Sequence, residues 1–188
     1  MGKANSSGAG GDFPHPVTEV TSGGALRLGK VISGGQTGVD RAALDAALAT
    51  GLAVGGSCPR GRRAEDGVVP ARYPLTELDR ADYAARTERN VLDADATLIV
   101  KRGELSGGTA LTLRLARRWQ RPVLVMDVMD PPPVSRFIDW LRANEVVVLN
   151  VAGPRESGAP GIHRQARQLL EGWFRQVLLQ RRRESSEM

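Results

Sequence analysis

The sequence predicts an α/β protein: a doubly wound sandwich in which a mostly parallel sheet of five or slightly more strands lies between two layers of helices. Two observations carry this prediction. Short runs of branched apolar residues alternate along the chain with longer stretches of helical periodicity, which is typical of parallel strands joined by crossover helices. The runs are also almost continuously apolar, as expected of strands that are buried on both faces.

Length and composition allow one such domain. The 188 residues are enough for a domain that buries about 70% of the surface of its unfolded chain. Because 41% of the residues are hydrophobic and 25% are charged, fibrous, collagen-like and wholly disordered classes are excluded. Residues 1–27 are rich in Gly and Ser and lack periodicity, which predicts a flexible N-terminal arm. Residues 28–180 are expected to form the single ligand-binding domain.

The elements follow in chain order. Strands are expected at Lys30–Ser33, Ala53–Gly55, Thr97–Val100, Val123–Met126 and Val146–Asn150. The helices between them are expected at about Val39–Thr50, Ala81–Leu92, Thr109–Gln120 and Ser135–Ala143.

A longer helix ends the domain. Its apolar residues recur at helical spacing along one face: Ile162, Ala166, Leu169, Leu170, Trp173, Phe174, Val177 and Leu178. Such a stripe is usually core, but this helix is long enough to cover the sheet and still reach a subunit contact. The sequence therefore predicts a homo-oligomer. Residues 181–188, three arginines followed by ESSE and the final Met, are expected to form a frayed helix end and a basic C-terminal tail.

Several classes of protein and site are excluded. The only cysteine, Cys58, allows no internal disulfide and no cysteine-cluster metal site, and His15 and His163 add too few ligands for a typical zinc site. No apolar run approaches the roughly 18 residues of a transmembrane helix. The N-terminus lacks the apolar segment of a secretion signal, so a cytoplasmic protein is expected. The net charge of +5 favours anionic partners, or serves only solubility.

The sharpest motif is a glycine-rich turn, SGGQTGVDR, which starts at Ser33 directly after the first strand and opens the first helix. Glycines let the backbone approach a ligand, and the amide groups at a helix N-terminus attract anions. The turn also fits a structural alternative, a capping box formed by Thr37 and Asp40. Its candidate anion-binding residues are Gly34, Gly35, Gln36, Thr37, Gly38, Asp40 and Arg41.

A second turn of the same type, Ser106-Gly107-Gly108-Thr109, lies between the third strand and the third helix, and all four residues are candidates. In an open parallel sheet, ligands bind beyond the carboxyl ends of the strands where the strand order reverses. If the first and third strands are neighbours, both turns border this crevice. Neither turn is GxGxxG or GxxxxGK[ST], which argues against NAD-dependent dehydrogenases and P-loop NTPases.

The loop after the second strand carries three more candidates, Arg60, Arg62 and Arg63. Guanidinium groups suit phosphates and oxyanions because each offers paired donors. The alternative is internal pairing with Glu65 and Asp66 of the same loop. Cys58 at its start is either a soft ligand for molybdenum or another metal, or a buried inert thiol.

These residues carry a resemblance that spans about Val31 to Leu170. The sequence resembles the molybdenum carrier (molybdenum cofactor carrier) family, a circularly permuted branch of the SLOG superfamily of Rossmann-like, lysine-decarboxylase-like proteins. The matching stretches are SGGQTGVDRAALD from Ser33, CPRGRRAEDG from Cys58, YPLTE from Tyr73, the stretch with Arg86, Thr87 and Asn90, Gly107–Thr109, and LNVAGPRE from Leu149.

The resemblance implies a Rossmann-like three-layer sandwich and a cytoplasmic homo-oligomer, a dimer or tetramer, that binds the molybdenum cofactor (molybdopterin), molybdate or a related anion. The two glycine-rich turns would hold this ligand, the arginines of the loop would contribute, and molybdenum cofactor enzymes would be its partners. The alternative is a nucleotide phosphoribohydrolase-like enzyme that cleaves an N-glycosidic bond with Asp40 or Glu65 as the acid. Nucleic-acid binding is disfavoured, because only 4% of the residues are aromatic.

Overall fold

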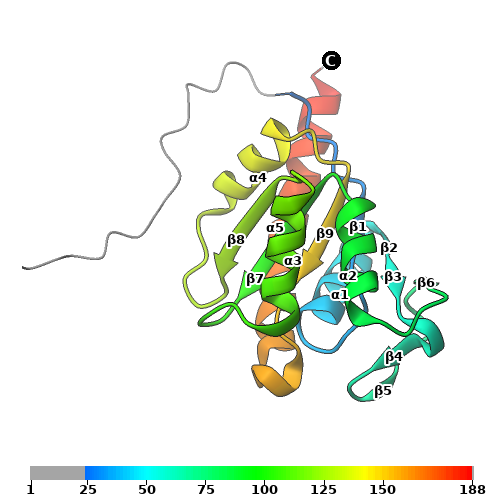
Figure 1. Ribbon diagram of the computed structural model, residues 1–188. Helices are drawn as coiled ribbons and strands as arrows, with labels where there is room; N and C mark the ends of the chain where they lie inside the picture. Colours follow the sequence, from blue (N-terminus) through cyan, green and yellow to red (C-terminus); the bar gives the residue numbers. More distant parts are fainter. Residues whose placement is uncertain (1–23, 188) are drawn as a thin grey trace, which may run out of the picture.

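A computed structural model describes residues 24–187 and shows a single five-stranded parallel sheet as the centre of the molecule (Figure 1). Its strand order is β2-β1-β9-β7-β8. The strands are β1 (Lys30–Ile32), β2 (Ala53–Gly55), β7 (Ala96–Lys101), β8 (Val123–Asp127) and β9 (Val148–Ala152). The predicted α/β class, the number of main strands and their parallel arrangement are confirmed.

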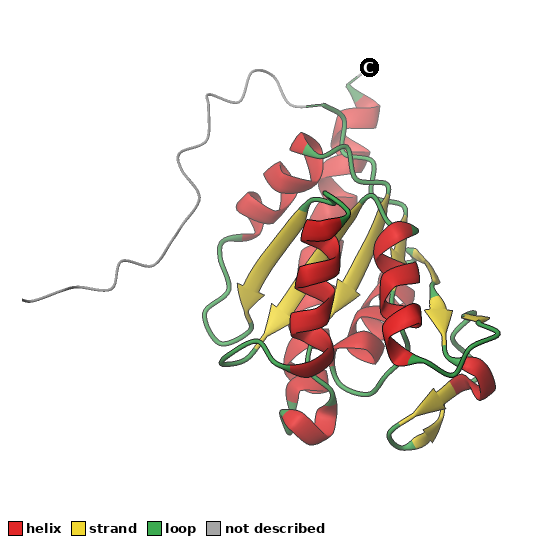
Figure 2. Ribbon diagram, in the orientation of Figure 1, coloured by secondary structure: helices red, strands yellow, loops and turns green. Residues whose placement is uncertain are grey.

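Helices cover both faces of this sheet (Figure 2). One face is covered by α2 (Tyr83–Leu92) and α3 (Gly107–Arg118), which pack against each other. The other is covered by α1 (Val39–Thr50) and α5 (Ile162–Ser186), and α4 (Val134–Ala143) packs against α5. The result is the expected three-layer sandwich.

Residues 57–77, whose first part up to Gly67 was predicted as a loop, contain four two-residue strands. β3 (Ser57–Cys58) pairs in parallel with β6 (Thr76–Glu77), and β4 (Arg63–Ala64) pairs antiparallel with β5 (Gly67–Val68). A 3-10 turn over Arg60–Arg62 precedes β4. Such short strands have no readable periodicity, so the sequence pattern could not reveal them.

The side chain of Asn90 in α2 holds the start of this segment. Its amide oxygen accepts from the Ser57 N–H at 2.7 Å and its amide nitrogen donates to the Ser57 carbonyl at 3.1 Å. Both residues are buried. A side chain thus supplies the two hydrogen bonds that a neighbouring strand would otherwise provide.

The apolar stripe of α5 is part of the subunit's own core. Trp173 stacks on Phe137 of α4 with ring centroids 4.8 Å apart, and Phe174 is fully buried. The remaining buried stripe residues are Ile162, Ala166, Leu170 and Val177. Leu169 and Leu178 are only partly buried. The predicted role of the stripe as core is confirmed, while the subunit contact stays a prediction.

The folded domain extends beyond both predicted boundaries, and its two ends contact each other. Leu26 is only 3% exposed and its N–H donates to Glu184 at 3.1 Å, so the packed chain begins before residue 28. Arg181 donates to the Leu28 carbonyl at 2.7 Å. Residues 181–186, expected as a tail, are the last part of α5. Most of the predicted arm, residues 1–23, lies outside the described residues, as does Met188.

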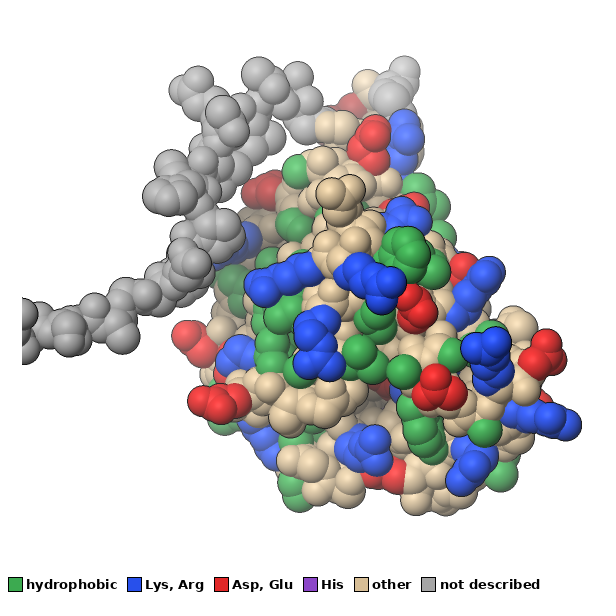
Figure 3. Space-filling model, viewed as in Figure 1, with side chains coloured by type: hydrophobic (Ala, Val, Ile, Leu, Met, Phe, Trp, Pro, Cys, Tyr) green, Lys and Arg blue, Asp and Glu red, His purple; other side chains and the backbone are tan. Residues whose placement is uncertain are grey.

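The outer surface of α3 is basic. Arg114, Arg117 and Arg118 are exposed there, and Figure 3 shows Lys and Arg side chains spread over the face that α2 and α3 cover. Within residues 24–187, no helix is both long enough and apolar enough to cross a membrane.

Candidate functional site

Two cavities open at the edge of the sheet where the parallel strands end. The first, which we call the turn pocket, has a volume of about 320 Å³. Its lining includes Gln36 and Asp40 from the first glycine-rich turn and helix α1, Arg86 and Thr87 from α2, Ser106–Thr109 from the second turn, and Gly153–Arg155 from the loop after β9. Residues of the two turns that are 70 positions apart in sequence therefore meet around one cavity.

The strand order behind this pocket does not meet the condition that the first and third predicted strands are neighbours. β1 and β7 are not neighbours, because β9, the last strand in the chain, pairs with both and lies between them. The loop after β9 therefore contributes the third wall. It packs directly on the first turn: Val39 N–H donates to the Pro154 carbonyl at 3.1 Å. A Cβ on Gly38 would lie 2.3 Å from that oxygen, so the close approach requires glycine.

The backbone amides of Gln36 and Thr37 in the first turn are used inside the protein. Gln36 N–H donates to the Asp40 carboxylate at 3.3 Å, and Thr37 N–H donates to Oε1 of Gln36 at 3.0 Å. The same oxygen accepts from Glu65 N–H at 2.9 Å. Gln36 is only 7% exposed, and its Nε2 has no hydrogen-bond partner within residues 24–187. Gln36, the residue of this turn that lines the pocket, therefore offers a side-chain donor, because its own N–H is paired with Asp40.

The second turn keeps its amides free. Ser106 is the N-cap residue of α3, and no hydrogen bond of the described chain uses the N–H of Gly107 or Gly108. Both glycines are exposed and line the turn pocket. The first amides of a helix carry partial positive charge, so this turn has the properties predicted for an anion-binding turn.

A buried ion pair in the turn pocket connects helix α2 to the start of helix α1. Nη1 of Arg86 lies 2.9 Å from Oδ2 of Asp40, whose residue is only 4% exposed. Burial raises the pKa of Asp40 and outweighs the opposing effect of the Arg86 charge. The guanidinium group lies where a side chain at residue 34 would be, since a Cβ on Gly34 would be 1.4 Å from Nη1 of Arg86. Nε of Arg86 is buried and has no partner within residues 24–187.

Arg86 is a pocket residue that was named in a stretch of the family resemblance but not among the candidate anion-binding residues. The available signal was the composition of α2, in which Thr87 and Asn90 are buried although both are polar. Polar residues on the buried face of a helix need partners, which often belong to a site. Arg155 was also missed, because it lies in the loop after β9 and strand order, which depends on long-range pairing, could not be predicted from the sequence.

The other candidates of the first turn have structural contacts. Arg41 forms a two-pronged ion pair with Asp66, with N–O distances of 2.5 and 2.7 Å, and its Nε donates to the Gly35 carbonyl. The Thr37 hydroxyl contacts the Glu65 carboxylate. The predicted capping box is wrong, because Gly38 is the N-cap residue of α1 and Asp40 receives its backbone hydrogen bond from the N–H of residue 36.

The three loop arginines are not brought to either cavity. Arg62 donates to four carbonyl groups of its own segment, those of Val69, Pro70, Tyr73 and Leu75, at 2.9–3.1 Å. It holds this segment together and has no nitrogen left for a ligand. Arg60 and Arg63 are exposed to solvent and line neither cavity.

Of the two alternatives for Cys58, a soft metal ligand or a buried inert thiol, the structure favours the buried thiol. It is fully buried in a small cluster with Leu44, Val69, Tyr73 and Leu75, and burial raises the pKa of the thiol. It therefore cannot serve as a soft metal ligand in the turn pocket. Among residues 24–187, no three His, Cys, Asp or Glu side chains gather as a metal site.

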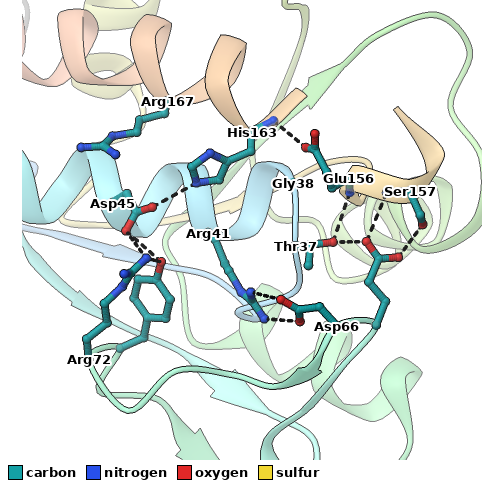
Figure 4. Close-up of a pocket in the computed structure, with 12 residues that line it drawn as sticks. Thr37, Gly38, Arg41, Asp45, Asp66, Arg72, Glu156, Ser157, His163 and Arg167 are labelled. Atoms are coloured by element: carbon teal, nitrogen blue, oxygen red, sulfur yellow. Dashed lines mark hydrogen bonds and ion pairs between the residues drawn. The ribbon is translucent and has the colours of Figure 1, made fainter. Parts of the chain in front are cut away.

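The second cavity lies on the other side of the first turn, between the start of α1, the β4–β5 hairpin and the start of α5, and we call it the α1–α5 pocket. Its volume is about 920 Å³. Figure 4 shows charged side chains around it, including Asp45, Arg72, His163 and Arg167. Sequence reasoning did not find it, because its residues come from four separate segments without a shared motif.

Comparisons with known proteins agree with this architecture. Residues 31–174 match the model of the circularly permutated YpsA SLOG family. The crystal structure of a protein from Syntrophus aciditrophicus SB, named "Putative molybdenum carrier protein", is similar with a TM-score of 0.73 and 44% sequence identity over 78% of this chain and 94% of that chain. A comparison with curated proteins gives no match. The region that matches the family includes every residue that lines the two cavities.

Proposed function

The chain belongs to the circularly permuted YpsA SLOG family, and on that premise we propose that it binds an anionic small molecule in the turn pocket and shelters it without converting it. The proposed cargo is the molybdenum cofactor, or a related molecule with a phosphate or oxyanion group. The name of the similar crystal structure suggests the cargo. The hydrogen-bond donors of the pocket support a negatively charged cargo.

One observation carries the proposal: the turn pocket contains hydrogen-bond donors that the protein does not use. Among the described residues 24–187, Nε2 of Gln36 and Nε of Arg86 are buried without partners, and the amides of Gly107 and Gly108 are free at the start of α3. An unsatisfied buried polar group costs about 1–3 kcal/mol. A ligand rich in acceptor atoms would recover this free energy, and an anion gains additionally from Arg86 and from the helix N-terminus.

The residues present fit the phosphate or oxo end of such a cargo. The volume of about 320 Å³ lies at the lower end of the range for small-molecule pockets. Cys58, the only thiol, is buried elsewhere. The pocket would therefore hold the cargo by hydrogen bonds to Gln36, Arg86 and the second turn.

The Gln36→Glu variant tests the proposal. Glutamate keeps the oxygen that accepts from Thr37 and Glu65, but it replaces the free NH₂ donor by a carboxylate oxygen that repels anions. We expect affinity for molybdate, the cofactor or a nucleoside monophosphate, measured by calorimetry, to fall about tenfold or more, which corresponds to about 1.4 kcal/mol. Gln168→Glu, which makes the same change at an exposed position of α5, is the matched control. Equal affinities in the two variants would contradict the proposal.

The environment of Asp40 favours a second candidate function. Its pKa is raised by burial, as a general acid for N-glycosidic cleavage requires, and it lines the turn pocket. The neighbouring Arg86 opposes this rise and would serve to attract a substrate phosphate. Glu65, the other candidate acid, lines the α1–α5 pocket and accepts hydrogen bonds from Thr37 and Ser157. Release of free base from adenosine monophosphate that is lost in a folded Asp40→Asn variant would establish the enzyme. Binding without release supports the carrier.

A further inference from the structure

We propose that the α1–α5 pocket is a second small-molecule site, which binds the phosphate or carboxylate group of an organic anion between Arg72, Arg167 and His163. This inference does not depend on the function of the turn pocket. The two cavities share no lining residue, and the first turn and the loop after β9 lie between them. The volume of about 920 Å³ is large enough for a small organic molecule.

Asp45 organises one end of this pocket. Its carboxylate accepts from the Tyr73 hydroxyl at 2.8 Å and from Arg72 at 3.3 Å, and it lies 3.0 Å from Nε2 of His163 (Figure 4). Because an ionised carboxylate only accepts, Nε2 carries the hydrogen in this contact. The Asp45 side chain is 11% exposed, so one partly buried anion holds an arginine, a tyrosine and a histidine in fixed positions.

The arginines at this end keep donors free. In the part of the chain that the structure describes, Arg72 uses only Nη2, for Asp45 and the Tyr73 hydroxyl, and its guanidinium lies 4.7 Å from the Tyr73 ring centroid. It is therefore held in place although its side chain is 62% exposed. Arg167 has one acidic neighbour within residues 24–187, Glu171, at 3.9 Å, which is beyond hydrogen-bond distance. In the view of Figure 4, the Asp45 carboxylate lies between the two guanidinium groups.

The charges at this end favour an anion. Among the residues that line this end, Arg72 and Arg167 accompany one carboxylate, that of Asp45, while Glu171 beside Arg167 does not line the pocket. At the opposite end, Glu65 accepts from Ser157, and Glu156 accepts from the N–H groups of Gly161 and His163. These carboxylates are satisfied by protein donors and need no bound cation. The free donors at the Asp45 end of the pocket include guanidinium groups, which bind phosphates and carboxylates in a two-pronged geometry.

The test is calorimetric titration of the full chain with inorganic pyrophosphate and, separately, with citrate, which distinguish a phosphate from a carboxylate preference. The double variant Arg72→Gln/Arg167→Gln removes both free guanidinium groups. We expect it to bind at least one of these probes about tenfold more weakly, whereas the double variant Arg164→Gln/Arg182→Gln, which loses the same charge from exposed positions of α5, should bind like the parent.

Other results would overturn the inference. It fails if the two double variants bind both probes with the same affinity, or if Gln36→Glu alone abolishes all binding of both probes, because the anions would then occupy only the turn pocket. A Gln36→Glu protein that keeps one site, lost on adding Arg72→Gln and Arg167→Gln, supports it whether or not the turn pocket carries the proposed cargo. Thermal unfolding of each variant checks that the exposed substitutions leave the fold intact.

Discussion

Gln36 shows how one side chain can serve both the fold and the site. Its amide oxygen accepts two backbone hydrogen bonds, which fix the first glycine-rich turn, while its amide nitrogen has no partner within residues 24–187. The sequence indicated this turn by its glycines, but the donors that face the pocket come from side chains. Arg86 repeats the pattern, with one nitrogen paired to Asp40 and another free.

The state of Cys58 gives a prediction at the residue scale. The thiol is fully buried and its pKa is raised, so the reactive thiolate is scarce and inaccessible at neutral pH. We expect a disulfide reagent to modify the native protein at least about 100-fold more slowly than the protein unfolded in guanidinium. Because the chain has a single cysteine, the absorbance signal reports this residue alone. Rapid stoichiometric modification of the native protein would show that the cluster around Cys58 opens readily.

At the scale of elements, the segment from Ser57 to Glu77 depends on Arg62. Four carbonyl groups of the segment accept from this one guanidinium, and its own backbone lies in the left-handed region with φ of 51°. Arg60 and Arg63, its neighbours in sequence, are exposed. Three arginines that look alike in sequence therefore differ in what they bind.

Substitution should reveal this difference. We expect Arg62→Gln to lower the free energy of unfolding by about 2 kcal/mol or more, because several charge-assisted hydrogen bonds to carbonyl groups are lost together. Arg60→Gln and Arg63→Gln, the matched controls, should each change it by less than about 0.5 kcal/mol. Urea unfolding measures all three. Equal effects would mean that Arg62 contributes no more than an exposed arginine.

The end of α5 gives a pH-dependent prediction at the same scale. Glu184 accepts from Arg142 and from the N–H of Leu26, and these hydrogen bonds lower its pKa below the ordinary 4.5. The folded pKa is the lower one, so the stabilisation by the carboxylate is present above about pH 4.5 and is lost as the pH falls through the folded pKa. We expect Glu184→Gln to reduce stability at pH 7 by about 1 kcal/mol and to have little effect near pH 2.

Thermal unfolding at the two pH values checks this expectation, with Glu187→Gln at the exposed end of the same helix as control. A loss of stability that is equal at both pH values would assign the effect to packing instead of to the carboxylate charge.

At the scale of the whole molecule, buried and exposed positions of α5 test different properties: substitutions in the buried stripe test folding, and substitutions at exposed positions test assembly. Phe174 is fully buried in the core, so Phe174→Glu should unfold the subunit, at a cost of several kcal/mol. Leu179 is 47% exposed, and Leu179→Glu should leave the fold intact. Circular dichroism distinguishes these outcomes, and a folded Phe174→Glu protein would contradict the position of this helix.

The expected homo-oligomer is tested by the same pair of variants. If α5 takes part in a subunit contact, light scattering of the Leu179→Glu protein should show a smaller species than the parent. A parent protein that is monomeric at micromolar concentration would exclude the oligomer under those conditions. An unchanged oligomer mass would place the contact on another surface.

The sequence by itself determined the α/β class, the five main strands, the five helices and the two glycine-rich turns, because hydrophobic periodicity and glycine placement are local properties of the chain. It could not place β9 between β1 and β7, since strand order depends on long-range pairing. Nor could it show that Arg62 binds its own segment while Arg86 faces the turn pocket. Which charges are paired and which remain free is decided only when distant segments meet. The α1–α5 pocket exists for the same reason, because three segments bring Asp45, Arg72, His163 and Arg167 to one place.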